Sequence, residues 1–183
     1  MNDGMSSGIR KARLTVPAAG RDHVQGPTDA PITLLEYGDY ECPYCGEAHP
    51  IVKAVQDRLG NRLCFAFRHF PLMMVHPRAE HGAEAAEAAA AQGKFWQMHD
   101  LLFENQDALE DEDLAEYAAT LGLDAKQLMG EVRNRAHEER IREDLQTGRR
   151  LGVNGTPTFF VNGVPYEGEV EVNALLTALT ENS

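Results

Sequence analysis

The order of elements at the start of the chain is the feature that most limits its fold. The run PITLLEY, residues 31–37, is apolar and has the length of a strand. A Cys-x-x-Cys pair, Cys42 and Cys45, follows it and leads into a segment with apolar residues at helical spacing up to Gly60. Residues 62–71 form a second apolar run of strand length. This strand–helix–strand order predicts a βαβ unit with two parallel strands.

The rest of the chain divides by the spacing of its apolar residues. In residues 77–148 they recur at helical spacing, which predicts a series of helices. Strand signals return in TPTFFVNGVPYEG, where Asn162 and Gly163 predict a tight hairpin, and an amphipathic segment closes the chain. We therefore expect an α/β fold in which an all-helical insertion, residues 77–148, separates a βαβ half, residues 23–76, from a ββα half, residues 149–183.

The net charge limits the partners that the chain can bind. The formal charge is −12 at pH 7, and residues 77–148 hold 17 acidic but only 7 basic residues. Such a surface repels the phosphates of nucleic acids and of anionic lipids. No apolar run approaches the ~18 residues that cross a bilayer. We therefore expect neither a nucleic-acid partner nor a membrane partner.

The N-terminal segment, residues 1–22, is predicted to be a flexible arm. It contains basic residues but lacks the apolar stretch of a signal peptide, so we expect a cytoplasmic protein. Three cysteines are too few for a disulfide scaffold. In a reducing compartment, a Cys-x-x-Cys pair is more often catalytic or metal-binding than structural.

A zinc site is the first explanation to weigh for the two cysteines. Structural zinc needs four ligands, usually from a second Cys-x-x-Cys pair or two closely spaced histidines. Cys64 and seven scattered histidines could supply them, but none forms a second pair, and Cys64 lies in an apolar run where an inert buried cysteine is expected. His49, one turn past the pair, is expected to face solvent. We therefore expect no metal site.

Electron transfer by a cysteine pair requires one activated thiol and one shielded thiol, and the positions of Cys42 and Cys45 fit these two roles. Cys42 falls at the start of the predicted helix, and Pro43 suits the first turn because it has no N–H group to leave unpaired. Free N–H groups and the helix dipole lower a thiol pKa from ~8.5 into the range of ~3.5–7, so Cys42 would be a thiolate at neutral pH. Cys45, one turn further in, would be shielded and placed to resolve a mixed disulfide. Tyr44 is expected to be exposed.

Three motifs, in this order, resemble the DsbA-like branch of the thioredoxin-fold oxidoreductases. They are EYGDYECPYCG around the cysteines, GKFWQMHDLLFENQ in the helical segment and GTPTFFVNG near the C-terminus. The resemblance runs from about residue 23 to the end of the chain. It implies a thioredoxin fold that carries a helical insertion, and the activity of a protein disulfide oxidoreductase.

The resemblance also implies roles for residues outside the cysteine pair. Pro157 matches the cis-proline that stands beside the Cys-x-x-Cys pair in this fold, and Thr156 matches the residue whose backbone pairs with the substrate. Pro43 and Tyr44 would also contact the substrate. Glu36 matches a buried acid on the central strand, which can exchange a proton with the resolving thiol.

We therefore expect thiol–disulfide exchange with protein clients, in which Cys42 attacks and Cys45 resolves the mixed disulfide. The cysteine pair itself carries the electrons, so we expect no cofactor. The expected partners are disulfide or thiol proteins, with glutathione or a thioredoxin-type protein as electron donor.

Two alternatives stay open. The Pro-Tyr dipeptide between the cysteines is typical of glutaredoxins, so one alternative is a glutathione-dependent reductase or isomerase. The other is a non-enzymatic redox-switched binding module or chaperone. A reducing cytoplasm favours reduction or isomerisation of client disulfides, but the residues do not set the direction of electron flow.

Overall fold

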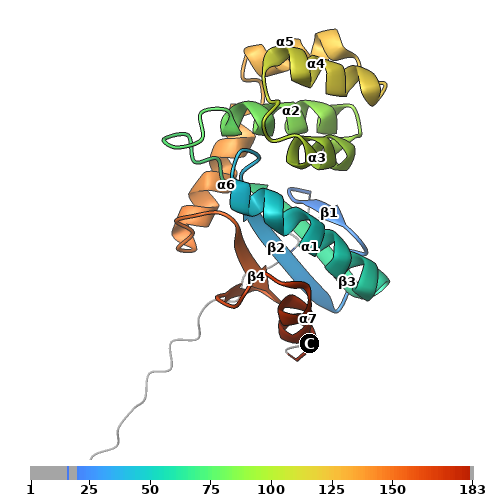
Figure 1. Cartoon of the computed structure of the whole chain (residues 1–183), viewed down its shortest axis with the longest axis vertical. Coiled ribbons are helices and arrows are strands. Elements are labelled where there is room, and N and C mark those ends of the chain that lie inside the picture. The colour runs from blue at the N-terminus through green and yellow to red at the C-terminus, as the bar shows by residue number, and fades with distance from the viewer. Residues whose placement is uncertain (1–15, 17–19, 182–183) are drawn as a thin grey trace, which may run out of the picture.

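The computed structural model describes residue 16 and residues 20–181 (Figure 1). In chain order its elements are β1 (His23–Gln25), β2 (Ile32–Gly38), α1 (Pro43–Leu59), the 3-10 turn η1 (Gly60–Arg62), β3 (Leu63–His69), α2 (Ala79–Ala91), α3 (Phe95–Glu104), α4 (Asp111–Thr120), α5 (Ala125–Arg133), α6 (Glu138–Arg150), β4 (Thr158–Val161), β5 (Val164–Tyr166) and α7 (Val172–Glu181). Within these described ranges, no helix has the length and apolar character needed to cross a membrane.

The five strands form one mixed sheet in the order β1-β3-β2-β4-β5. β2 and β3 run parallel along their whole length, from Ile32 opposite Leu63 to Gly38 opposite His69, and α1 connects them. β4 pairs antiparallel with β2, and β5 pairs antiparallel with β4. The predicted βαβ unit and the returning strands are therefore confirmed, and they form the sheet of a thioredoxin fold.

The turn between β4 and β5 is set by two residues. Asn162 and Gly163 have φ values of 49° and 79°, which the two-residue hairpin turn requires and which asparagine and glycine tolerate. The side-chain oxygen of Asn162 also accepts a hydrogen bond from the backbone N–H of Thr33 at 2.9 Å. The predicted hairpin is confirmed, and its turn is anchored to the central strand.

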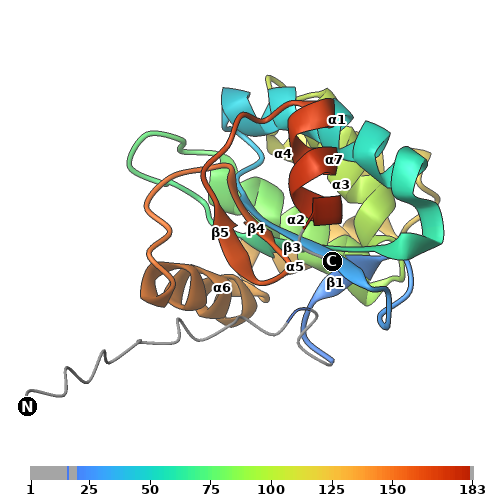
Figure 2. The same ribbon diagram turned by 90° about the horizontal axis from the view of Figure 1, so that it is seen from below.

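Alternation along β2 directs its side chains into two cores. Ile32 and Leu34 belong to the larger core, which includes residues of α1 and α7, whereas Leu35 and Tyr37 belong to a smaller core with a residue of α6. Figure 2 shows α1 and α7 over one face of the sheet and α6 over the other. Because neighbouring strand residues face opposite sides, Glu36 lies on the side of α1.

The helices between β3 and β4 share the larger core. α2 to α5 gather at one side of the sheet and α6 leads back from them (Figure 1). Met98 and Leu102 of α3 and Leu114 of α4 are buried in the same cluster as Val52 of α1. The predicted α/β architecture with an inserted helical segment is confirmed, and a continuous core joins the two parts.

The N-terminal region joins the fold earlier than predicted. Residues 1–15 and 17–19 of the predicted arm lie outside the described residues. At its end, however, Arg21 pairs with Asp144 at 2.9 Å and Asp22 pairs with Arg68 at 2.7 Å. These ion pairs hold the chain before residue 23, where the predicted arm was to end. The three-residue strand β1 was not predicted, because its pairing with the edge of β3 leaves no periodic signal in so short a segment.

Candidate active site

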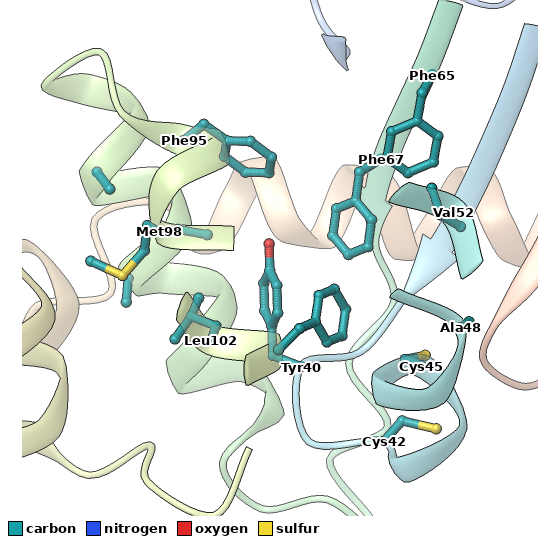
Figure 3. Packing of buried hydrophobic residues seen from close by; sticks show 14 of the residues in the cluster. Tyr40, Cys42, Cys45, Ala48, Val52, Phe65, Phe67, Phe95, Met98 and Leu102 are labelled. Atoms are coloured by element: carbon teal, nitrogen blue, oxygen red, sulfur yellow. The ribbon is translucent and has the colours of Figure 1, made fainter. Parts of the chain in front are cut away.

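Cys42 lies at the N-terminal end of α1. It is the N-cap residue, with φ −74° and ψ 120°, and Pro43 begins the helix. The backbone N–H of Cys42 donates to the carbonyl of Asp39 at 3.2 Å, and the N–H of Gly46 donates to the carbonyl of Cys42 at 3.1 Å. Figure 3 shows the sulfur atoms of Cys42 and Cys45 together at this first turn. The sequence placed both cysteines at this position.

Thr156 and Pro157 stand beside Cys42, although they lie 114 residues or more further along the chain. The Cys42 sulfur lies 3.3 Å from the carbonyl oxygen of Thr156, to which it donates a hydrogen bond when it is protonated, and the Thr156–Pro157 peptide bond is cis. The structure therefore brings together the two segments that were predicted to form the site.

The surroundings give the two thiols opposite properties. The hydrogen bond from the Cys45 side chain has the largest effect on the pKa of Cys42, and it lowers that pKa. Burial opposes this effect, whereas hydrogen bonds from the Thr156 side chain and from the backbone N–H groups of Cys45 and Tyr44 add to it. The pKa of Cys42 therefore falls to about 5. Burial raises the pKa of Cys45 far above its ordinary value, and the hydrogen bond with Cys42 and the charge of Glu36 raise it further. At neutral pH Cys42 is therefore a thiolate and Cys45 a protonated thiol.

Glu36 is a buried acid on the side of the sheet that faces α1. It is 2% exposed, and its Oε1 atom has no hydrogen-bond partner. Burial first, and then the charge of Cys42, raise the pKa of Glu36 to about 8. Because Glu36 in turn raises the pKa of Cys45, the acid and the second thiol are electrostatically coupled. Near neutral pH this carboxyl can hold or release a proton beside the cysteine pair.

The rim of the site is exposed and partly apolar. Tyr44 is 70% exposed, as predicted, and Pro43 is also exposed. A pocket of about 570 Å³ beside Pro43 is lined by residues such as His76 and Gln106. The loop before His76 carries Met74, which is 98% exposed. Flexible apolar side chains of this kind suit contact with varied polypeptides.

Two residues that hold the active-site loop were not found from the sequence. The side-chain amide of Gln106 donates to the carbonyls of Tyr40 at 3.0 Å and of Cys42 at 2.8 Å. Asp39 is buried, and its carboxylate accepts N–H groups from its own turn and from the loop after β3, at 2.8 and 2.9 Å. Asp39 follows a strand and could have been read as a turn residue. Gln106 gives no local signal, because its partners are more than sixty residues away.

The position of His49 differs from the prediction. His49 was expected to face solvent, but it is 9% exposed and its ring stacks on Phe103, with centroids 5.1 Å apart. The reason is that α3 covers this side of α1. His99 of α3 is also buried, and its Nδ1 atom shares a hydrogen bond of 2.9 Å with the Tyr40 hydroxyl. Burial lowers the pKa of both imidazoles.

Two further histidines share one carboxylate. The Nε2 atoms of His23 in β1 and His69 in β3 each lie 2.8 Å from Oε1 of Glu87 in α2. Burial opposes ionisation of Glu87, but the hydrogen bonds from both histidines outweigh it and lower the pKa of Glu87. This cluster connects the sheet to the helical insertion.

Comparison with known proteins places this site in a family. The family described as Thioredoxin matches residues 18–181 of the chain. The structure of a thioredoxin-like oxidoreductase from Silicibacter pomeroyi DSS-3 matches with a TM-score of 0.79 and 28% identity, over 89% of this chain and 92% of that one. BdbD from Bacillus subtilis, in its oxidised form, matches with a TM-score of 0.76 and 23% identity, over 88% and 90% of the two chains. At 23% identity, the match to BdbD shows a shared fold. The predicted membership of the thioredoxin fold is confirmed, and the fold is shared with the thiol-disulfide exchange protein alpha-DsbA2 from Wolbachia pipientis, which matches with a TM-score of 0.77 and 20% identity over 88% and 87% of the two chains.

The curated relatives are much longer proteins. The Na(+)/H(+) antiporter NhaA 1 of Salinispora arenicola (strain CNS-205) is 47% identical over 178 residues, which are 97% of this chain but 27% of that protein. A protein of the same name from Mycobacterium sp. (strain KMS) is 46% identical over 161 residues, which are 87% of this chain and 26% of that protein. The chain therefore spans about a quarter of the length of these relatives, and their name describes the longer proteins.

Proposed function

The chain belongs to the thioredoxin family, and we propose that it is a protein disulfide oxidoreductase that uses Cys42 and Cys45 as a dithiol pair. One observation carries this proposal. The Cys42 sulfur, whose pKa is lowered to about 5, lies at a helix N-terminus 3.3 Å from the carbonyl of Thr156 and next to the Pro157 segment. A thiolate is the nucleophile in disulfide exchange, so this placement supplies both the reactive form and a backbone group beside it.

The exchange proceeds in two steps. The Cys42 thiolate attacks one sulfur of a client disulfide, so that a Cys42–client bond forms, the client S–S bond breaks, and the other client sulfur leaves as a thiolate. Cys45 then loses its proton and attacks the Cys42 sulfur, which forms the Cys42–Cys45 disulfide and releases the second client thiolate. The client gains two electrons and the cysteine pair loses two. The reverse sequence oxidises a client dithiol, and no cofactor enters either direction.

We propose that Glu36 accepts the proton that Cys45 loses in the second step. Burial raises the pKa of Glu36 most, and the negative charge on Cys42 raises it further; this second contribution disappears when the mixed disulfide forms. The pKa of Glu36 then falls, so the carboxylate becomes available as a base at the stage when Cys45 must lose its proton. The acid therefore acts in the resolving step rather than in the first attack.

We assign client binding to the rim of the site. The backbone of Thr156, two residues before β4, would pair with an extended client segment next to Cys42, as in strand addition. Pro43 and Tyr44, which are both exposed, would contact the client side chains that flank the disulfide. Main-chain pairing with a few apolar contacts fits clients of varied sequence.

The thiolate also bears on the direction of electron flow. A pKa of about 5 for Cys42 lies between those of thioredoxin, ~7, and DsbA, ~3.5. A more stable thiolate stabilises the reduced pair, so we expect a stronger oxidant than thioredoxin and a weaker one than DsbA. Such a pair can isomerise disulfides or, with an electron donor such as glutathione, reduce them. Cytoplasmic location stays a prediction.

Reduction of insulin by dithiothreitol tests the proposal. Cys42→Ser should abolish the catalysed rate, whereas Cys45→Ser should accumulate a client disulfide on Cys42 that mass spectrometry detects. Cys64→Ser is the matched control, because Cys64 is buried in β3 outside the pair, and it should keep the wild-type rate. Full activity in Cys42→Ser would refute the dithiol mechanism.

The same variants separate the two alternatives. If Cys45→Ser removes glutathione from a glutathionylated peptide, the glutathione-dependent alternative is favoured. If the wild-type protein binds clients in a redox-dependent way without catalysing exchange, the chain is a binding module.

A further inference from the structure

A second group of reactive side chains lies where α1 meets α3, outside the cysteine pair. His49 of α1 and the adjacent His99 and Asp100 of α3 each offer one metal-ligating atom, and these atoms lie within 4.8 Å of one another. The two imidazole rings meet edge to face, with centroids 5.4 Å apart. Because α3 belongs to the helical insertion and α1 to the βαβ unit, the group bridges the two parts of the fold.

The spacing between His49 and Asp100 is unusual for a hydrogen-bonded pair. The Nε2 atom of His49 is buried without a hydrogen-bond partner, and Oδ1 of Asp100 lies 3.4 Å away. A hydrogen bond between an N–H group and a carboxylate is ~2.7–2.9 Å long, so this distance is too great. Two ligand atoms that are each ~2.0–2.2 Å from a tetrahedral zinc ion lie about 3.4 Å apart. The distance therefore fits a shared metal ion better than a hydrogen bond.

Other contacts orient the three ligands and leave one atom of each available. Lys53 donates to Oδ2 of Asp100 at 2.7 Å, which leaves Oδ1 toward His49. The Tyr40 hydroxyl occupies Nδ1 of His99 at 2.9 Å, which leaves Nε2. The ring of His49 is held by stacking on Phe103. Metal ligands in proteins typically have such outer partners, which fix the ring orientation and the tautomer.

An ion can reach this group from outside. A pocket of about 510 Å³ reaches His49 of this group and is also lined by Lys53 of α1 and by Phe103 and Glu104 of α3, among others. Asp100 is itself partly exposed, with 29% of its side-chain surface accessible. Asp57 and Glu104 add negative charge to the pocket lining, which attracts cations.

We propose that His49, His99 and Asp100 form a binding site for a divalent transition metal ion, of which zinc is the best fit. Two imidazole nitrogens and one carboxylate oxygen suit zinc and its neighbours, whereas calcium and magnesium prefer oxygen ligands. Three protein ligands leave a fourth position for water or another small ligand. The site uses no cysteine, so it is separate from the zinc site weighed above, and it does not depend on the proposed disulfide exchange.

The location predicts what the metal does for the fold. An ion that binds α1 and α3 at once stabilises the folded chain, because the unfolded chain holds these ligands apart. The melting temperature should therefore rise with the concentration of zinc. Since the ligands come from both parts of the molecule, the metal would also restrain the insertion against the helix that carries the cysteines.

Calorimetric titration with zinc sulfate tests the site. The full chain is first freed of metal with a chelator and oxidised to the Cys42–Cys45 disulfide, so that the thiolates cannot compete. We expect one zinc ion per chain. His49→Gln and Asp100→Asn should each weaken binding by at least about tenfold, the loss that even outer-shell substitutions cause. His81→Gln is the matched control, since His81 also faces a carboxylate, 2.8 Å from Asp111, but lies outside the group. It should keep the wild-type affinity.

A measurement on the unmodified protein decides the matter if the variants fail to fold. Zinc should shift the imidazole NMR signals of two buried histidines and leave that of His81 in place. Absence of saturable binding, equal affinity in His49→Gln, or shifts confined to exposed histidines would overturn the proposal and assign any bound zinc to the acidic surface.

Discussion

Replacing Glu36 by glutamine should change how stability depends on pH. The folded chain keeps this carboxyl protonated up to about pH 8, whereas the unfolded chain releases the proton near pH 4.5. Between these values the unfolded state binds fewer protons, so the free energy of unfolding falls as the pH rises, by about 1.4 kcal/mol per pH unit. The contribution is complete below pH 4.5 and is lost as the pH approaches 8. Over the whole window it is on the order of 5 kcal/mol, a large part of the stability of a typical domain.

Glutamine has nearly the same shape but does not titrate. Relative to the wild type, Glu36→Gln should gain about 1.4 kcal/mol of unfolding free energy for each unit between pH 5 and pH 7.5. The buried amide also introduces an unpaired polar group, at a cost of about 1–3 kcal/mol that does not vary with pH. The slope of the difference is therefore the quantity to measure, rather than its value at one pH.

Urea denaturation of the reduced proteins at several pH values between 5 and 7.5 gives this slope. Glu47→Gln is the matched control, because Glu47 lies on the exposed side of α1, the helix that packs over Glu36, and its profile should run parallel to that of the wild type. If Glu36→Gln also runs parallel to the wild type throughout, Glu36 is not a protonated buried acid, and its assigned role as the base for Cys45 fails with it.

Three further predictions rest on other contacts. Cys45→Ala removes the main cause of the lowered pKa of Cys42, so the pH midpoint of Cys42 alkylation by iodoacetamide should rise from about 5, and an unchanged midpoint would contradict this cause. Glu87→Gln should lower the unfolding free energy at pH 7 by about 3–5 kcal/mol in urea denaturation. Since the pKa of Glu87 is lowered, that difference should shrink as the pH falls below about 4.5, and a constant difference would refute it. Gly38→Ala should cost about 1–3 kcal/mol, because a Cβ atom there would lie 2.4 Å from a β3 aromatic ring, whereas Gly130→Ala, in open space on α5, should gain about 0.5–1 kcal/mol. Thermal unfolding that ranks these two variants in the opposite order would contradict the packing.

Local sequence signals were sufficient for most of the fold. The apolar run at residues 31–37, the helical spacing of residues 77–148 and the Asn162–Gly163 turn each specify an element through neighbouring residues, and all three elements form where they were predicted. β1 could not be predicted in this way, because its three residues become a strand only by pairing with the edge of β3. Its formation depends on tertiary contact rather than on local preference.

The residues of the candidate site also fall into two groups, those positioned by local sequence and those positioned by tertiary packing. Cys42, Pro43 and Cys45 are neighbours in sequence, so their position at a helix start follows from the local pattern. Gln106 and His49 depend on how the helical insertion packs against α1, which local spacing does not encode. The polar contacts between the two parts of the molecule, including the proposed metal site, therefore became visible only in the structure.

The most direct test of the central claim is the reduction potential of the Cys42–Cys45 pair, measured by equilibration with glutathione buffers and by counting free thiols by mass. All three cysteines are free in the structure. The account predicts one two-electron transition that leaves only Cys64 free, with a midpoint between the ~−270 mV of thioredoxin and the ~−120 mV of DsbA. Glutathione adducts on Cys42 without a Cys42–Cys45 disulfide at any buffer ratio would contradict it.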